Sequence, residues 1–266
     1  MQSVPFVKYH GAGNDFILVD DRQGKWGDLM NEAWIANTCH RRFGIGADGL
    51  ILLQRGTDGA DFFMRYYNSD GKTSTFCGNG GRCIVAYAAQ LNIHSGSCKF
   101  LGTDGWHTGT MTPDGLVCLS MMDVNALDVI DDHTFTLYTG SPHFVTFVDD
   151  VKSVNVQQEG RSIRNSERFQ KEGINVNFIE IIGLSEIRIR TYERGVEDET
   201  MACGTGVVAA AIANAFYQEN LSGLCIVRAV GGTLTVEFNR LDQQHFSEVK
   251  LTGPAVEVFR GEILLG

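Results

Sequence analysis

The chain is poor in proline, cysteine and positive charge. It holds 4 Pro and 7 Cys in 266 residues, and 22 Lys and Arg stand against 32 Asp and Glu, a formal net charge of −10 at pH 7. So few prolines argue against a Pro-rich disordered chain, and so few cysteines, odd in number, argue against a disulfide scaffold. An acidic chain also lacks the basic patch typical of nucleic-acid binding. A chain of this length can bury a core without a metal or a disulfide.

Long apolar runs and targeting signals are also missing. The segment Met1–Lys8 lacks the apolar stretch of a secretory signal. The longest apolar run, from about Val207 to Phe216, contains an Asn and is too short to cross a membrane. Cys77 and Cys83 are six residues apart and no Cys-x-x-Cys pair occurs, so the spacing predicts no zinc site. We therefore expect a cytoplasmic protein with free thiols, no membrane or nucleic-acid partner and no bound metal.

What the chain does contain is 31 glycines and an internal repeat. The segments Cys77–Gly80 and Cys203–Gly206 share a Cys-Gly-x-Gly core, 126 residues apart. Four further pairs follow in the same order at offsets of 125 to 128. They are Gly13–Val19 with Ser141–Phe147, Ala47–Ile51 with Asn175–Ile179, Tyr67–Asn68 with Tyr192–Glu193, and Gly105–Met111 with Gly232–Phe238. Five colinear pairs indicate a duplicated unit of about 125 residues.

Each unit shows the same order of patterns. Strand-like runs come first: Phe16–Val19, Leu50–Leu53 and Phe62–Tyr67 in one unit, Phe144–Val148, Phe178–Ile182 and Ile187–Tyr192 in the other. An alanine-rich helix follows each Cys-Gly-x-Gly turn, and hairpins follow with turn signals at Pro113–Gly115 and Gly231–Gly232. The second helix, about Val207 to Ala213, is apolar on every side and should be buried all round.

A helix buried among many strands predicts a sheet that curls around it. We expect an α+β fold of two pseudo-twofold-related lobes, each a curled, antiparallel-rich β-sheet around a central helix, with an active-site cleft between them. The N-terminal lobe is predicted over residues 1–119, joined by a C-terminal return at about 255–266. The C-terminal lobe is predicted over residues 120–254.

Two glycine-rich segments lead to different interpretations. Gly44–Gly49 fits Gly-x-Gly-x-x-Gly, but the strand-like run Leu50–Leu53 follows it, where a dinucleotide fingerprint needs a helix. A tight turn into a strand is therefore predicted there. The segment Gly78–Gly81 instead precedes a helix, whose N-terminus offers N–H donors and a positive dipole end. Because glycine lets the backbone approach a ligand closely, a small carboxylate could bind at this turn.

Two of the seven cysteines, Cys77 and Cys203, stand at the starts of the two repeated helices, where the helix dipole favours the thiolate. Paired thiols of this kind suit the inversion of a carbon that bears an acidic proton. One thiolate removes the proton from one face, and the other group, still a thiol, delivers a proton to the opposite face. The two helix N-termini would stabilise the charge that develops on the substrate carboxylate.

The remaining cysteines have apolar or strand-like neighbours and are predicted to be buried and structural. They are Cys39, Cys83, Cys98, Cys118 and Cys225. No lysine stands in a context that indicates a Schiff base, so no pyridoxal cofactor, and no other cofactor, is expected.

Five segments carry a more specific signal in combination than any of them carries alone. They are Lys8–Phe16, Asn68–Gly71, Cys77–Cys83, Tyr192–Gly195 and Ala202–Gly206. Together they closely resemble the diaminopimelate epimerase family, and the resemblance extends from about residue 6 to the tail Thr252–Val256. The resemblance implies a pyridoxal-independent isomerase that interconverts LL- and meso-diaminopimelate with two cysteines, in the lysine and peptidoglycan precursor pathway. The family fold, two lobes of β-structure each wrapped around a central helix, agrees with the pattern above.

The resemblance also implies a role for each matching residue. Cys77 and Cys203 would be the base and the acid, and the backbone N–H groups of Gly78-Asn79 and Gly204-Thr205 would hold the reacting carboxylate.

Glu193 and the Arg194 segment would bind the amino group and the distal carboxylate, while His143 and Glu193 would assist the proton balance of the cysteines. The other substrate contacts would be Asn14, Asn68 and Asn175. A substrate with two ammonium and two carboxylate groups calls for neutral amides together with an Arg fork.

Two positions depart from the family pattern. Many members have Asn-Pro-His where this chain has Ser141-Pro142-His143, and some carry Gln at the position of Gly49. The loss of an amide at Ser141 removes one substrate contact, which a hydroxyl or a water could replace. Simpler roles also remain open for single residues: Asn14 and Asn68 as turn residues, His143 as a surface histidine, Arg194 as half of a weak ion pair.

Three other functions stay open at this point. A proline-racemase-like, cofactor-independent racemase would also use two cysteines, although the Tyr-Glu-Arg-Gly and Gly-Asn-Asp-Phe segments argue against it. A cysteine hydrolase or acyltransferase could pair Cys203 with His143, but the second matched cysteine would then have no role. A non-catalytic binding module is the third. The expected partner is a small-molecule substrate, diaminopimelate, and a homodimer is left open.

Overall fold

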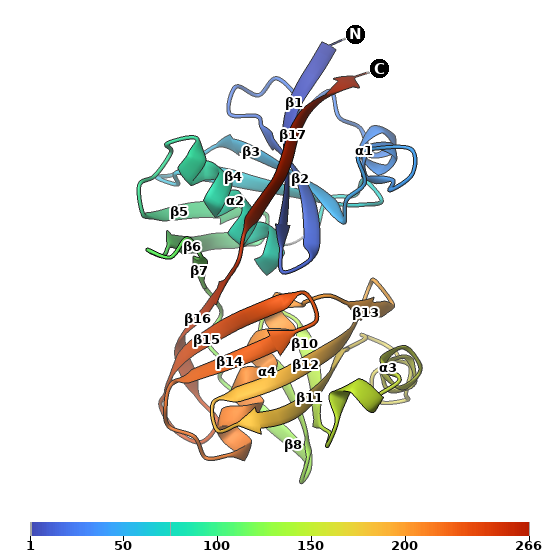
Figure 1. Cartoon of the computed structure of the whole chain (residues 1–266), viewed down its shortest axis with the longest axis vertical. Coiled ribbons are helices and arrows are strands. Elements are labelled where there is room, and N and C mark those ends of the chain that lie inside the picture. Colours follow the sequence, from blue (N-terminus) through green and yellow to red (C-terminus); the bar gives the residue numbers. More distant parts are fainter. Residues whose placement is uncertain (1, 75, 266) are drawn as a thin grey trace. The chain divides into compact units, whose positions relative to one another are not determined.

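The computed structural model describes residues 2–74 and 76–265, and the chain divides into two compact units (Figure 1). Unit 1 comprises Met1–Leu119 and Pro254–Gly266, and unit 2 comprises Ser120–Gly253. The C-terminal strand β17 (Val256–Leu265) belongs to unit 1 because it pairs antiparallel with β1 (Gln2–Gly11) over almost its whole length. The chain therefore closes unit 1 only after unit 2 has been completed.

The strands of unit 1 lie in the order β17–β1–β2–β3–β4–β5–β6–β7. After β1, they are β2 (Asn14–Asp20), β3 (Gly49–Arg55), β4 (Phe62–Asn68), β5 (Ser97–Gly102), β6 (Gly105–Met111) and β7 (Val117–Ser120). The β2–β3 and β4–β5 pairs are parallel, and the other neighbours are antiparallel.

The strands of unit 2 lie in the order β8–β9–β10–β11–β12–β14–β15–β16. They are β8 (Leu127–Asp131), β9 (Thr134–Tyr138), β10 (Pro142–Phe147), β11 (Asn175–Gly183), β12 (Glu186–Glu193), β14 (Leu224–Ala229), β15 (Gly232–Arg240) and β16 (Phe246–Gly253). The short strand β13 (Asp198–Thr200) folds back on the end of β12.

The two units have the same topology. In both, the third and fourth strands and the fifth and sixth strands pair in parallel, and every other neighbouring pair is antiparallel. The hairpin β12–β13 has a counterpart in unit 1, where Tyr67 at the end of β4 bridges to Thr73. Strands β6 and β15 both begin at a glycine with positive φ, 132° at Gly105 and 151° at Gly232. The internal repeat is therefore a repeat of architecture, which confirms the predicted α+β fold of each unit.

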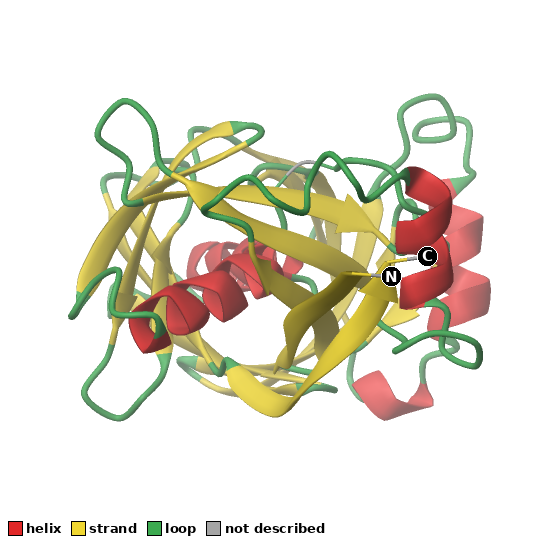
Figure 2. Ribbon diagram, turned by 90° about the horizontal axis from the view of Figure 1, so that it is seen from above, coloured by secondary structure: helices red, strands yellow, loops and turns green. Residues whose placement is uncertain are grey.

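One helix lies at the centre of each unit, as the sequence predicts. Helix α2 (Gly78–Gln90) contacts β1, β2, β3, β4 and β6, and α4 (Gly204–Tyr217) contacts β9, β10, β11, β12, β14, β15 and β16. Figure 2 shows a helix enclosed by strands. The apolar residues Val207, Val208 and Ile212 of α4 are fully buried although they lie on different sides of the helix.

Among the described residues, three short helices lie outside the central ones and were not predicted. They are α1 (Glu32–Cys39), the 3-10 helix η1 (Val151–Ser153) and α3 (Val156–Arg164). Asparagine caps α1 and α3: the side chain of Asn31 accepts a hydrogen bond from the N–H of Trp34, and that of Asn155 from the N–H of Gln158. These caps were the signal in the sequence that could have located both helices.

Candidate active site

Cys77 and Cys203 occupy equivalent backbone positions. Each is the N-cap residue of its central helix, with φ −113° and ψ 118° at Cys77 and φ −107° and ψ 114° at Cys203. Neither side chain caps its own helix, so each sulfur is available for other contacts. The two thiols that the sequence singled out thus stand at the two helix N-termini where they were predicted.

The first turn of each helix points N–H groups away from the helix. The N–H of Gly81 donates to Cys77 O at 2.7 Å, and the N–H of Val207 donates to Cys203 O at 2.8 Å. The N–H groups that precede these donors, beginning at Gly78 and Gly204, have no acceptor inside the helix. Such N–H groups, at the positive end of a helix dipole, bind carboxylates and other anions.

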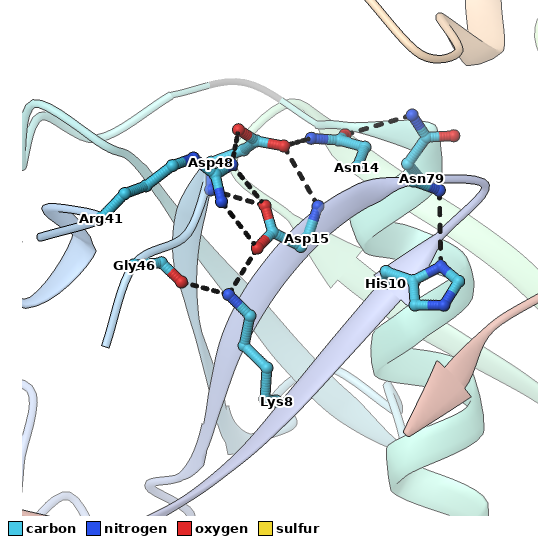
Figure 3. A network of polar contacts seen from close by, with 9 residues as sticks. Lys8, His10, Asn14, Asp15, Arg41, Gly46, Asp48 and Asn79 are labelled. Carbon is cyan, nitrogen blue, oxygen red and sulfur yellow. Dashed lines mark hydrogen bonds and ion pairs between the residues drawn. The ribbon is translucent and has the colours of Figure 1, made fainter. Parts of the chain in front are cut away.

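In unit 1, Asn14 of β2 lies in a network of polar side chains (Figure 3). Asn14 Oδ1 accepts hydrogen bonds from Asn79 Nδ2 at 3.1 Å and from the Cys77 thiol at 3.6 Å. Asn14 Nδ2 donates to Asp48 Oδ2 at 2.6 Å, which fixes the orientation of the carboxamide. The predicted site residues Asn14, Cys77 and Asn79 therefore lie together.

Two carboxylates and two cations hold Asn14 in place (Figure 3). The Lys8 ammonium pairs with Asp15 at 2.5 Å, and the Arg41 guanidinium spans Asp15 at 2.7 Å and Asp48 at 2.6 Å. Burial raises the pKa of Asp15, but hydrogen bonds from Arg41 and Lys8 outweigh it and lower that pKa to about 2. Asp15 is thus ionised at neutral pH, and the four charges of this network cancel.

In unit 2, His143 of β10 is connected to Cys203 through the Thr205 hydroxyl. His143 is 0 % exposed, and its Nε2 lies 2.9 Å from Thr205 Oγ1, which lies 3.5 Å from Cys203 Sγ. Burial lowers the pKa of His143, and the nearby Arg194 charge lowers it further, to about 3. The imidazole is therefore neutral at neutral pH, and only one of its nitrogens carries a proton.

Asn177 of β11 determines which nitrogen of His143 carries that proton. The Asn177 carboxamide donates from Nδ2 to Phe144 O at 2.9 Å and accepts at Oδ1 from the Thr191 hydroxyl at 3.0 Å. The same Nδ2 lies 3.1 Å from His143 Nδ1, which must then be the acceptor. The proton is consequently on Nε2 and is donated to Thr205 Oγ1, which leaves the hydroxyl proton of Thr205 to point at the Cys203 sulfur.

Ser141, Asn175 and Arg194 form a second cluster of predicted residues beside His143. Ser141 Oγ accepts from Asn175 Nδ2 at 2.9 Å and from Arg194 Nη2 at 3.3 Å. Asn175 Oδ1 accepts from the backbone N–H of Arg194 at 2.9 Å. Arg194 is exposed, so its guanidinium is accessible to an anionic ligand. The serine that departs from the family pattern thus takes part in orienting two of the predicted substrate contacts.

Glu193 and Asn68 are the two remaining predicted residues. Glu193 ends β12 next to Arg194, but its carboxylate accepts from the Thr200 hydroxyl of β13 at 3.0 Å. Asn68 is exposed at the end of β4, and its backbone forms a turn through hydrogen bonds with Lys72 and Gly71. Within the part of the chain that the structure describes, no hydrogen bond connects the Asn68 side chain to Cys77.

Gly44–Gly49 leads into strand β3, so the predicted turn into a strand is confirmed.

The other cysteines differ chemically from these two. Cys39, Cys83, Cys98 and Cys225 are buried, and burial raises the pKa of each of them, to about 12 for Cys39, Cys98 and Cys225. Cys118 on β7 is half-buried rather than buried, the one departure from the prediction. Among residues 2–74 and 76–265, no group of three or more His, Cys, Asp or Glu side chains could hold a metal ion.

Sequence reasoning missed the residues that support the site, namely Asp48, Asn177 and Thr191. An alternating pair of amides, Asn175 and Asn177, in the otherwise apolar run Asn175–Ile179 was the available signal. Gly206 is also required at its position, because a Cβ there would lie 2.5 Å from Asn177 Oδ1 and 3.4 Å from His143 Cε1. The first turn of α4 can approach the buried histidine only without a side chain at this residue.

No helix among the described residues is long and apolar enough to span a membrane.

Known proteins of two kinds are similar to the chain: curated relatives by sequence and solved structures by fold. The solved structures include a phenazine biosynthesis protein of the PhzF family from Bacillus anthracis, with a TM-score of 0.73 at 14 % identity over 99 % of this chain and 100 % of that one. They also include a probable proline racemase from Agrobacterium radiobacter with bound carbonate, with a TM-score of 0.66 at 16 % identity over 99 % and 93 % of the two chains. These structural similarities establish the fold of the chain but not its activity.

Sequence comparison is more specific. The diaminopimelate epimerase family model matches residues 6–125 and 135–258. A protein of Flavobacterium psychrophilum named diaminopimelate epimerase is 45 % identical over 256 residues, which cover 96 % of this chain and 98 % of that protein. A protein of the same name from Chlorobaculum tepidum is 41 % identical over 262 residues, covering 96 % and 99 %. On this match along nearly its whole length, the chain belongs to the diaminopimelate epimerase family.

Proposed function

We propose that the chain interconverts LL- and meso-diaminopimelate by proton transfer between Cys77, Cys203 and one α-carbon of the substrate, without a cofactor. The observation that carries this proposal is the equivalence of the two thiols. Each is the N-cap residue of the central helix of its unit, with nearly the same backbone angles. Epimerisation needs one proton-transfer group for each face of the carbon, and a duplicated unit supplies two such groups.

In the proposed reaction, one cysteine thiolate takes the α-proton, so that an S–H bond forms as the C–H bond breaks. The electron pair left on the α-carbon delocalises into the adjacent carboxylate. The second cysteine, a thiol, then donates its proton to the opposite face of the carbon and becomes the thiolate. One proton leaves and one enters, so the reverse reaction begins from the enzyme form in which the forward reaction ends.

The first turns of α2 and α4 would stabilise the charge that builds up on the reacting carboxylate. Their outward N–H groups, beginning at Gly78 and Gly204, are fixed by the helices and need no reorganisation when the charge develops. Removing one such donor from an oxyanion site costs on the order of 3 kcal/mol in other enzymes. This contribution comes from the backbone and depends on the glycines that keep the turns open.

The polar clusters would bind the rest of the substrate. Asn14 beside Cys77 and Asn175 beside Arg194 offer neutral amides, and Arg194 offers a guanidinium for the distal carboxylate. We assign Glu193 to the amino group, since its carboxylate lies on the residue next to Arg194. Asn68 remains a proposed contact with the distal part of the substrate.

His143 would assist Cys203 without taking a proton from it. A buried neutral imidazole whose proton is on Nε2 can donate to Thr205, and Thr205 can donate to the thiolate. This arrangement stabilises the thiolate of Cys203 by a hydrogen bond and not by a positive charge. Glu193, which accepts from the Thr200 hydroxyl, would also assist the proton balance of the cysteines.

The decisive experiment is incubation with LL-diaminopimelate in deuterated water without pyridoxal phosphate. We expect the meso isomer to form with deuterium at one α-carbon. Exchange into proline but not into diaminopimelate would replace this proposal by a proline-racemase-like activity. Absence of exchange into either would leave a binding protein or a hydrolase. A role in the lysine and peptidoglycan precursor pathway, a cytoplasmic location and a homodimer stay predictions.

A further inference from the structure

Arg82 is a buried cation with no carboxylate partner among the described residues. It lies in α2 five residues after Cys77 and is 0 % exposed. Its Nη2 donates to Asn79 Oδ1 at 2.7 Å and its Nε to Pro254 O at 3.3 Å, while Nη1 has no hydrogen-bond partner among the described residues. A guanidinium is always protonated, and burying it without an anion is costly. A residue retained at such a cost calls for a function.

The charged groups around Arg82 do not supply the missing anion. Among the described residues, the thiols of Cys83 and Cys77 raise the pKa of Arg82 against the larger, lowering effect of burial. Burial also raises the pKa of Cys83 far above neutrality, so that this thiol is uncharged. Cys77 is left as the group that can provide a negative charge.

Other titratable groups lie on the elements around Cys77. The network around Asn14 holds two cations and two carboxylates, so it contributes no net charge. On the other side, the Phe76 ring stacks on His107 with centroids 3.8 Å apart, and His107 Nε2 lies 3.0 Å from Asp104 Oδ1. His10 of β1 accepts from the N–H of Gly13 through Nδ1, at the hairpin that holds Asn14.

Unit 2 shows that the fold does not require this arginine. The repeat offset of 126 that relates Cys77 to Cys203 places Val208 opposite Arg82 and Thr205 opposite Asn79. Val208 is fully buried in α4, as Arg82 is in α2. The same helix in the same topology therefore packs with an apolar residue at this position, and the positive charge belongs to one unit alone.

We propose that Arg82 is a positioning residue for Cys77: it orients the Asn79 carboxamide and supplies the buried positive charge that favours the Cys77 thiolate. Its catalytic consequence rests on the function proposed above. In the resting enzyme Cys77 is then the thiolate and Cys203 the thiol, although their backbone positions are equivalent. The Thr205 hydroxyl can also stabilise a Cys203 thiolate, but a hydrogen bond from a neutral group has a weaker effect than a buried positive charge.

Two contacts around Cys77 act in opposite directions. Asn14 Oδ1, 3.6 Å from the sulfur, favours the protonated thiol, but a thiol is a weak hydrogen-bond donor. The Arg82 charge is permanent and shielded from water, so its effect on the thiolate is stronger than that of this contact. Arg82 also holds Asn79 Oδ1, which directs Asn79 Nδ2 toward Asn14 and withdraws electron density from the oxygen that faces Cys77.

The test measures the thiols directly. The rate of alkylation by iodoacetamide is followed from pH 5 to pH 10, and peptide mass spectrometry separates Cys77 from Cys203. In the unaltered protein we expect Cys77 to have the lower pH midpoint. In Arg82→Gln, which can still donate to Asn79, we expect the Cys77 midpoint to rise by about one pH unit, and alkylation below the midpoint to slow about tenfold. Cys203 in the same sample is the matched control and should not shift.

Arg82→Lys keeps the positive charge without the planar guanidinium. It should bring the Cys77 midpoint at least halfway back from the value in Arg82→Gln to that of the unaltered protein. A midpoint of Cys77 at or above that of Cys203 in the unaltered protein would overturn the proposal, and that measurement stands even if Arg82→Gln fails to fold. An unchanged midpoint in a folded Arg82→Gln would also overturn it. Because alkylation needs no substrate, its result is independent of the deuterium experiment. A shifted midpoint without epimerisation would reject the proposed function and leave the role of Arg82 intact.

Discussion

Acidification should weaken unit 2 through His143, because this histidine is buried in its neutral form. Its pKa is lowered from 6.5 to about 3 by burial and by Arg194. Between these values the unfolded chain binds a proton that the folded chain does not bind. The free energy of unfolding therefore falls as the pH drops from about 6.5 towards 3, and the effect is absent above that window.

The magnitude follows from the two pKa values. At pH 5 an unfolded histidine with a pKa of 6.5 is almost fully protonated, whereas His143 with a pKa of about 3 is not. The difference amounts to about 2 kcal/mol of lost stability at pH 5, and it would approach roughly 5 kcal/mol below pH 3. The matched variant is His143→Gln, because its amide can donate to Thr205 and it does not titrate. Between pH 7.5 and pH 5, the free energy of unfolding of this variant should fall by about 2 kcal/mol less than that of the unaltered protein.

Urea unfolding at pH 7.5, 6 and 5 can measure this difference by circular dichroism. The three tryptophans Trp26, Trp34 and Trp106 all lie in unit 1, so their fluorescence reports unit 1 in the same samples. The fluorescence transition should depend on pH equally in both proteins. If the circular-dichroism transition also showed the same pH dependence in both, His143 would not be held neutral, and the proton assignment in the relay to Cys203 would be wrong.

Three further predictions concern the two thiols and the first turn of α4. Cys77→Ala and Cys203→Ala should each abolish epimerisation, measured as deuterium incorporation; full activity in either variant would contradict the two-thiol mechanism. Thr205→Val removes the hydroxyl between His143 and Cys203 and should lower the turnover number about tenfold to a hundredfold, since hydrogen bonds to charged groups contribute about 1.5–3 kcal/mol, whereas Thr205→Ser should retain most activity. Gly206→Ala places a Cβ 2.5 Å from Asn177 Oδ1 and should lower the free energy of unfolding by about 1–3 kcal/mol; an unchanged urea midpoint would show that α4 shifts freely.

The elements with strong periodicity were predictable, and the short ones at the periphery were not. The repeated strands and the two central helices follow from apolar patterns and from a motif that recurs after 126 residues. Helices α1 and α3 were missed because each is only about two turns long. Their stability depends on an asparagine cap and on packing against the sheet, and neither is evident in a short apolar pattern.

The thiols were predictable because chemistry and repetition coincide there, but their supporting residues depend on strand register. Parallel pairing of β10 with β11 sets His143 beside Asn175 and Val145 beside Asn177. A shift of one residue would turn the Asn177 carboxamide to the other face of the sheet, away from His143. The amides can be read from the sequence, but the register of the β10–β11 pair cannot. For the same reason it could not show that Ser141, which departs from the family pattern, contacts Asn175 and Arg194.

Duplication created two equivalent cysteine positions, and later divergence made their surroundings different. Cys77 lies beside an ionic network and a helix that carries Arg82, whereas Cys203 lies beside a neutral histidine and a helix that carries Val208. A reaction that needs one thiol and one thiolate gains from this difference, because two identical sites would leave the resting protonation state undecided. The backbone equivalence places both groups at a helix N-terminus, and the side-chain differences decide which of them holds the proton. A substitution that makes the two surroundings alike, such as Arg82→Met, should therefore impair the reaction even though both cysteines and both helix N-termini remain.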